Sequence, residues 1–143
     1  MADIIFNAFI AHLGSGNIDW ESDTLRAALY SDISNFSKDS TVYTSTNELS
    51  TANGYTQNNK AVTGGTIITN NTDDVAQYDV ADITWTASGG SIGPASGCLI
   101  YDVTNANGAA YLIDFGAAKT ADDGTDFKIT IDASGLFLAR QAA

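Results

Sequence analysis

Apolar residues near the start of the chain recur about every 3.6 positions, which is the period of an α-helix. Within residues 3–13 these positions are Ile5, Phe6, Phe9, Ile10 and Leu13. Gly14 and Gly16 follow, and glycines are typical of helix C-termini. The pattern predicts a short helix over residues 3–13. Because so short a helix is marginal in isolation, we expect its apolar face to pack on its own domain. Whether that face also contacts a partner subunit is left open.

Beyond residue 16 the pattern changes to alternating or continuous apolar runs, which are typical of β-strands. Such runs occupy 24–30, 66–69, 75–80, 82–86, 98–103, 110–115 and 127–132. Asn107-Gly108 is a favoured hairpin turn, and it predicts that the runs on either side of it pair antiparallel. Strands at this spacing, with no long helix between them, predict a mainly β fold. We expect an antiparallel β-sandwich or a jelly-roll-like barrel with a short N-terminal α-helix.

Residues 31–59 interrupt the strand pattern with a long polar segment rich in Ser, Thr and Asn. The segment nevertheless contains Phe36, Val42, Tyr43 and Leu49. Disordered segments carry fewer aromatic and β-branched residues, so the sequence predicts an ordered loop with one short helical turn. Long ordered loops are often functional, which makes this segment a candidate contact surface.

The length of 143 residues suits one domain. We divide it into the helix and linker (1–16) and the β-sandwich (17–143). Seventeen acidic and six basic residues give a net charge of −11, which disfavours nucleic acid and anionic membranes as partners. No apolar stretch approaches the ~20 residues of a membrane span. The N-terminal apolar run lacks the preceding Lys or Arg of a secretory signal, so we expect synthesis and folding in a cytoplasm.

Residues able to support catalysis or metal binding are few. His12 is the sole histidine, and Cys98 is the sole cysteine and opens the most apolar strand. We expect Cys98 to be structural and His12 to be structural or merely exposed, without a cofactor or a metal. Two acidic clusters, at residues 19–23 and 122–126, are interpreted as solvated turns rather than calcium sites, because the EF-hand spacing is absent. The glycine-rich run 88–97 lacks the Lys of a phosphate-binding loop, and we expect it to form bends.

Four aromatic residues lie beside predicted strands, and two interpretations of them are open. They are Trp20, Tyr55, Trp85 and Tyr101. Aromatic side chains can form a platform that stacks on sugars, but next to buried strands they more often belong to the core. We favour the core interpretation.

The order of several short motifs resembles a family of small virion structural proteins of tailed bacteriophages. The motifs are G-N-I-D-W-E-S-D-T-L-R-A-A-L-Y (16–30), E-L-S-T-A-N-G-Y-T (48–56), K-A-V-T-G-G-T (60–66), A-D-I-T-W-T-A (81–87), C-L-I-Y-D (98–102), L-I-D-F-G (112–116) and D-F-K-I-T-I-D-A-S-G-L-F (126–137). The resemblance covers about residues 3–138. The chain departs from the family pattern at A-N-G-Y-T, where G-T-G-Y-T is closer to it, and at N-N-K before Ala61, where glycines are expected.

The resemblance implies a non-enzymatic capsid decoration or cement protein. Such a protein is made in the bacterial host cytoplasm, binds the major capsid protein on the outer surface of the virion and stabilises the shell. It implies a homo-oligomer, with a trimer favoured, and no catalytic residues. Under this hypothesis the partner-binding residues are Phe6, Phe9, Ile10 and Leu13, together with the loop 31–59. The alternative is a receptor- or glycan-binding module of a tail or head fibre. A small hydrolase is disfavoured, because no nucleophile and base can be paired.

Overall fold

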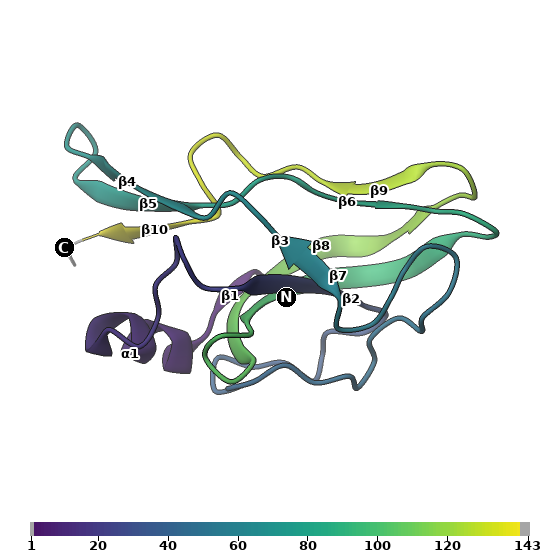
Figure 1. The fold of residues 1–143 in the computed structure, drawn as a ribbon, viewed down its shortest axis with the longest axis horizontal. Helices are drawn as coiled ribbons and strands as arrows, with labels where there is room; N and C mark the ends of the chain where they lie inside the picture. The colour runs from purple at the N-terminus through teal and green to yellow at the C-terminus, as the bar shows by residue number, and fades with distance from the viewer. Residues whose placement is uncertain (1, 141–143) are drawn as a thin grey trace.

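The computed structural model describes residues 2–140, which form two layers of antiparallel β-sheet with one short helix (Figure 1). This arrangement confirms the predicted mainly β, sandwich-like fold with an N-terminal helix. The hydrophobic core is one cluster of buried side chains, whose members come from positions between Ile4 and Phe137.

The larger layer is a five-stranded sheet in the order β1-β8-β7-β2-β3. Its strands are β1 (Ile4–Ile5), β2 (Leu25–Tyr30), β3 (Lys60–Val62), β7 (Ile92–Asp102) and β8 (Gly108–Ala121). All neighbours in this sheet are antiparallel. The central strands β2 and β7 carry near-continuous apolar runs, as expected for strands covered on both faces.

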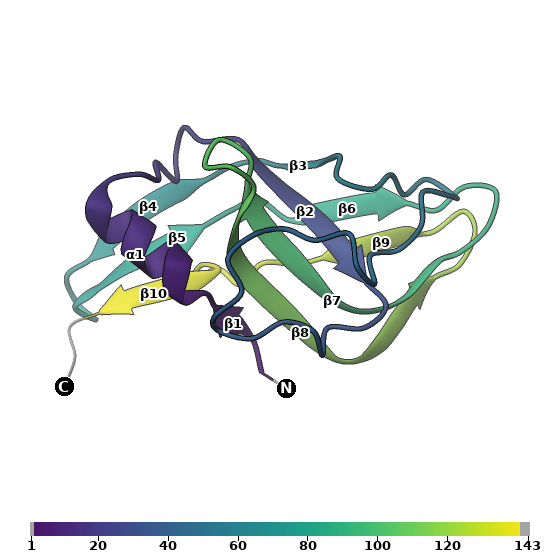
Figure 2. The ribbon, with the colours of Figure 1, turned by 90° about the horizontal axis from the view of Figure 1, so that it is seen from below.

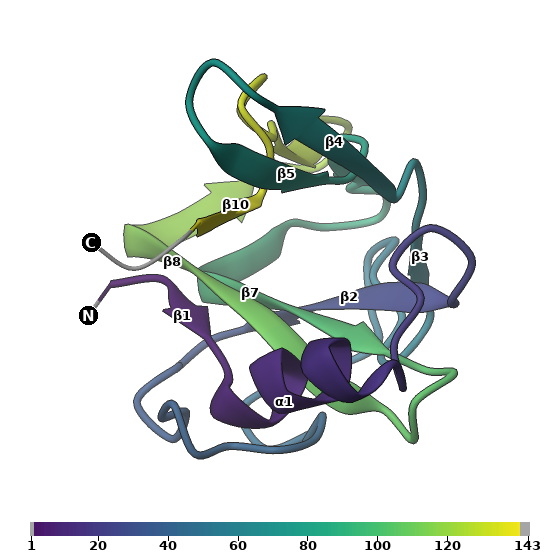
Figure 3. The same cartoon turned by 90° about the vertical axis from the view of Figure 1, so that its left-hand side faces the viewer.

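The opposite layer consists of two smaller antiparallel sheets, in the orders β10-β5-β4 and β6-β9. The strands are β4 (Thr66–Asn70), β5 (Val75–Asp79), β6 (Ile83–Thr86), β9 (Asp126–Ile129) and β10 (Phe137–Arg140). Figure 3 shows the β10-β5-β4 sheet facing the larger sheet, and Figure 1 shows β6 and β9 above β7 and β8.

The helix α1 (Asn7–Ser15) begins four residues later than predicted. Ile4 and Ile5 are paired instead with Leu112 and Tyr111 of β8 as the short strand β1. An exposed sheet edge provides hydrogen-bond partners that outweigh the helical periodicity at this end. The helix runs through Gly14 and ends at Ser15, two residues later than predicted. Gly16 caps it as predicted, with φ +77° and its N–H bonded to carbonyls of the last helical turn.

The helix packs against the end of the sandwich where β10 lies (Figure 2). Phe9 is buried there, with its ring centroid 5.7 Å from that of Trp20 and 5.6 Å from that of Phe137. Both contacts are edge-to-face, a favoured geometry for aromatic pairs.

Residues 31–59 form an ordered but irregular loop, as predicted, although the predicted helical turn is wrong. Isolated bridges join Tyr30 to Glu48 and Val42 to Gly108, which tie the loop to the ends of the larger sheet. Within the loop, side chains accept hydrogen bonds from backbone amides: Asp32 Oδ1 accepts the Ser34 N–H and Ser40 Oγ accepts the Ser37 N–H.

The glycine-rich run 88–97 is only partly a bend, because β7 begins at Ile92 and includes its second half. The small residues there allow close approach of the neighbouring strand. A Cβ atom on Gly97 would lie 2.6 Å from the Ile113 carbonyl oxygen of β8. The glycine content predicted bends over the whole run. Part of it is instead a strand, in which small residues are needed because the neighbouring strand lies close.

Candidate functional site

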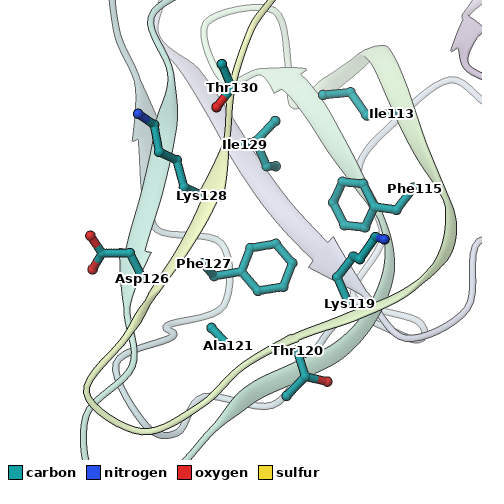
Figure 4. A pocket seen from close by; sticks show the side chains of 10 residues that line it. All are labelled: Ile113, Phe115, Lys119, Thr120, Ala121, Asp126, Phe127, Lys128, Ile129 and Thr130. Atoms are coloured by element: carbon teal, nitrogen blue, oxygen red, sulfur yellow. The ribbon is translucent and has the colours of Figure 1, made fainter.

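The described surface is hollowed by a groove between β8 and β9, which we call the β8–β9 groove (Figure 4). Its volume is about 420 Å³. Its lining residues are Ile113, Phe115, Lys119, Thr120 and Ala121 from β8, and Asp126, Phe127, Lys128, Ile129 and Thr130 from β9 and its extension. Both walls thus come from strands rather than from loops.

The lining shows that the groove follows the edge of a strand. Successive side chains of a strand point to opposite faces, yet all five residues from 126 to 130 line this hollow. A surface that touches both faces of one strand must run along its backbone edge. Figure 4 shows Phe127 and Ile129 directed towards β8, whereas Asp126 and Lys128 are directed away from it.

Neither strand beside the groove has a partner strand on that side within residues 2–140. β9 pairs only with β6. β8 pairs along its length with β7, and on its outer edge with β1 at Tyr111 and Leu112 alone. The groove therefore lies between the open edge of β9 and an edge of β8 that no strand covers beyond Leu112 but on which Asp3 accepts the Asp114 amide.

The apolar interior of the groove comes from one face of each strand. The Phe115 and Phe127 ring centroids lie 5.9 Å apart, so the two walls meet at the base of the groove. Phe127 and Ile129 are mostly covered, whereas Ile113 and Phe115 remain partly exposed. Those two partly exposed side chains of β8 provide apolar surface that a ligand can cover.

The open edge of β9 presents main-chain groups to the groove. The Ala87 N–H donates to the Thr125 carbonyl at 2.8 Å, and the Ile131 N–H donates to Asp82 Oδ1 at 2.9 Å. The main-chain N–H and C=O groups of the odd-numbered residues in this segment therefore point towards β6. Hydrogen-bonding direction alternates along an antiparallel strand, so the peptide groups of Lys128 and Thr130 face the groove.

Two basic side chains flank this edge in a chain with only six. Lys119 lies on the β8 wall beside Phe115 (Figure 4). Lys128 lies on the outer face of β9, with its Nζ 3.1 Å from Asp82 Oδ2. The Ile131 amide first and Lys128 second hold the pKa of Asp82 below its usual value.

A smaller hollow of about 160 Å³ adjoins the groove and extends it. The two hollows share Ile113, Ile129 and Thr130, and the smaller one continues to Asp3 and Leu136. The combined depression is elongated along β9, a shape suited to an extended chain.

The helix face predicted to bind a partner is mostly core. Phe6 and Phe9 are buried within the chain, and Leu13 is partly buried against the same core. Ile10 alone of the four is well exposed, at 53%. The expectation that the helix packs on its own domain is confirmed. Partner binding by this face stays a prediction, and it now depends on Ile10.

The four aromatic residues considered as a sugar platform are all buried, which confirms the core interpretation. Trp20, Tyr55, Trp85 and Tyr101 are each at most 4% exposed. Lys60 covers the Trp85 ring, with its Nζ 5.7 Å from the centroid. A ring that is buried on both faces cannot stack on a sugar.

The residues considered for catalysis or metal binding are dispersed. Cys98 is fully buried, and burial raises the pKa of its thiol. His12 lies on α1, with its Nδ1 3.3 Å from the Asn17 side-chain nitrogen. Asp19 Oδ1 accepts hydrogen bonds from the amides of Glu21 and Ser22, as in a turn. Within residues 2–140 no three His, Cys, Asp or Glu side chains converge to hold a metal ion.

The sequence pattern predicts the strand over 127–132 but does not predict the groove beside it. The alternation that predicts a strand does not say which neighbour that strand has. The local sequence carries no signal for the groove, because its two walls come from strands whose arrangement is set by the whole fold.

Comparisons with known proteins identify no relative. No protein-family model, no curated protein and no solved structure matches the chain. The resemblance to phage virion proteins therefore stays a prediction. Among residues 2–140, no helix has both the length and the apolar character needed to cross a membrane.

Proposed function

We propose that this chain is a non-enzymatic virion structural protein that binds the outer surface of a phage capsid and stabilises the shell. The observation that carries the proposal is the β8–β9 groove, which combines apolar side chains with an open strand edge. Open edges are usually covered or blocked in proteins that act alone. An open edge over an apolar groove therefore favours a partner protein.

The chemistry of the groove supports binding rather than catalysis. Its lining contains no His and no Cys, and Asp126 is its single carboxylate. Asp126 Oδ1 accepts a hydrogen bond from the Thr86 hydroxyl at 2.7 Å and is directed away from the interior. General acid–base and nucleophilic catalysis need paired groups, which this lining does not offer.

The proposed mechanism is additive binding of many copies. Each copy bridges neighbouring capsid subunits, and avidity multiplies modest individual affinities. The buried area of each contact raises the free energy needed to separate the subunits. A homo-oligomer, for which a trimer suits threefold positions of a shell, belongs to the same proposal.

The test uses particles assembled without this chain. Purified chain is added, the particles are sedimented, and bound copies are counted per capsid subunit. We expect saturable binding and a higher temperature of shell rupture. Failure to co-sediment would contradict the proposal. Binding to host cells or to sugars in place of the particle would favour the fibre alternative.

A further inference from the structure

We propose that the β8–β9 groove binds an extended peptide segment of the capsid partner, which adds as a strand to the open edge of β9. The inference rests on the proposed function and names the part of the partner that is recognised. Strand addition uses main-chain hydrogen bonds for affinity and alternate side-chain pockets for specificity. The groove offers both features along one edge.

Comparison with the edges of β4 and β8 shows how the edge of β9 differs from them. On β4 the Ile67 N–H donates to Glu21 Oε1 at 3.1 Å. On β8 the Asp114 N–H donates to Asp3 Oδ1 at 2.7 Å. Carboxylates thus block those two edges, a known means of preventing strand addition.

The edge of β9 has no such block. Within residues 2–140, no side chain accepts a hydrogen bond from the Lys128 or Thr130 amide. Both amides face the groove by the alternation of the β6–β9 ladder. A strand in the groove would complete these hydrogen bonds.

The side chains around the edge define the chemistry of the segment. Residues on its inner face enter over Phe115 and Phe127, so they are apolar. Lys119 on the β8 wall places a positive charge beside the segment, whereas Lys128 lies on the outer face of β9 and is ion-paired with Asp82. We therefore assign an alternating apolar segment with at least one Asp or Glu.

The length of the depression agrees with a strand rather than a compact ligand. A strand rises about 3.3 Å per residue, and the two adjoining hollows follow β9 from Asp126 to beyond Ile131. A segment of about five residues spans that distance.

The experiment removes one edge amide. Thr130→Pro removes the main-chain N–H that faces the groove. Proline should be tolerated there, because Thr130 is exposed and lies at the edge of a sheet. Thr69→Pro is the matched control, because Thr69 is an exposed threonine on the edge of β4. Circular dichroism and thermal melting establish that both variants fold.

Two assays use these variants together. The first measures binding to intact particles, and the second measures binding to overlapping short peptides that tile the major capsid subunit. We expect one stretch of adjacent peptides to bind the wild type and Thr69→Pro. Binding of that stretch and of the particle to Thr130→Pro should be at least about tenfold weaker.

A charge variant keeps the inference testable if Thr130→Pro does not fold. Lys119→Glu should weaken the same binding, whereas Arg140→Glu, which changes an exposed basic residue of β10, should not.

The outcomes separate the two proposals. If the wild type binds particles but neither Thr130→Pro nor Lys119→Glu weakens that binding, strand addition is wrong and the capsid function stands. Self-association through the groove in place of peptide binding also contradicts it. If the wild type does not bind particles, both proposals fail.

Discussion

Asp102, at the end of β7, carries a buried carboxyl group with one unsatisfied oxygen. Its Oδ1 accepts the Asn105 N–H at 3.1 Å, but its Oδ2 has no hydrogen-bond donor among residues 2–140. Burial first, and the neighbouring Asp23 carboxyl group second, raise the pKa of Asp102 to about 6. Protonation of Asp102 therefore removes the repulsion between two neighbouring carboxylates.

This pair predicts a pH-dependent stability. The folded state keeps a proton that the unfolded state releases near pH 4, so the free energy of unfolding falls as pH rises from about 4 to about 6. Asp102→Asn keeps the acceptor oxygen and adds a donor towards Asp23. We expect the variant to be more stable above pH 6, by on the order of 3 kcal/mol, and unchanged at pH 4.

Urea unfolding over this pH range measures the effect. Asp132→Asn is the control: Asp132 is exposed, and hydrogen bonds from Ser134 lower its pKa. Removing that charge should give no stabilisation at neutral pH. A variant at Asp102 with the pH profile of the wild type would contradict the assignment.

Among the elements, the long loop depends on a buried carboxylate. Glu48 accepts hydrogen bonds from the Tyr43 and Tyr55 hydroxyls and from the Asn58 amide. The Tyr55 hydroxyl in turn accepts the Leu29 N–H of β2 at 2.9 Å. Burial first, and then the interaction with Glu48, raise the pKa of both tyrosines. Glu48 thereby joins residues 43–58 to the larger sheet.

Glu48→Gln should loosen this loop without unfolding the sandwich. The glutamine NH₂ group is a hydrogen-bond donor, and it would face donors that now bond to the Glu48 carboxylate. We expect this mismatch to lower the stability of the loop by about 1–3 kcal/mol. Hydrogen exchange should become faster across residues 41–58 and stay slow in β7. Glu21→Gln, an exposed change, is the control. Unaltered exchange in the loop would show that other contacts order it.

The helix α1 allows a matched pair of substitutions on adjacent residues. Phe9 is 1% exposed and Ile10 is 53% exposed. Phe9→Ala should lower the free energy of unfolding by about 3–5 kcal/mol, whereas Ile10→Ala should change it by less than about 0.5 kcal/mol. Chemical denaturation measures both. Equal effects would mean that the helix does not dock as described. Ile10→Asp, rather than a change at Phe9, therefore tests partner binding by this face.

The strands that sequence predicted well are those with an unambiguous periodicity. Residues 25–30 and 98–102 are buried on both faces, and their apolar runs identify β2 and most of β7. Short edge strands escaped prediction, because two residues in β1 and four in β10 are too few to define a period. These strands form because they pair with strands far away in the sequence, and the local pattern of residues does not show which strands those are.

The groove escaped prediction for a related reason. Its apolar residues lie in runs that were predicted as strands, 110–115 and 127–132, but an open edge depends on which strands are neighbours. The carboxylate blocks at Glu21 and Asp3 likewise join residues far apart in the chain. The partner-binding prediction for Phe6 and Phe9 met the opposite problem. An apolar helix face suits a partner and a core equally well, and here the core covers both rings.

At the scale of the whole molecule, charge and groove impose different requirements on a partner. A net charge of −11 makes copies of the chain repel one another at low ionic strength. Dense packing on a shell therefore needs specific contacts that offset this repulsion. The groove, with Lys119 on one wall and Lys128 beside its edge, is the part of the surface that we propose makes them.

The most direct test of the capsid assignment is the copy number of this chain in purified virions, measured by quantitative mass spectrometry against the major capsid subunit. A decoration protein that covers the shell is expected at a ratio equal to the capsid subunit or a simple fraction of it. A few copies per particle would place the chain in a tail or fibre, and absence from the particle would contradict a virion role altogether.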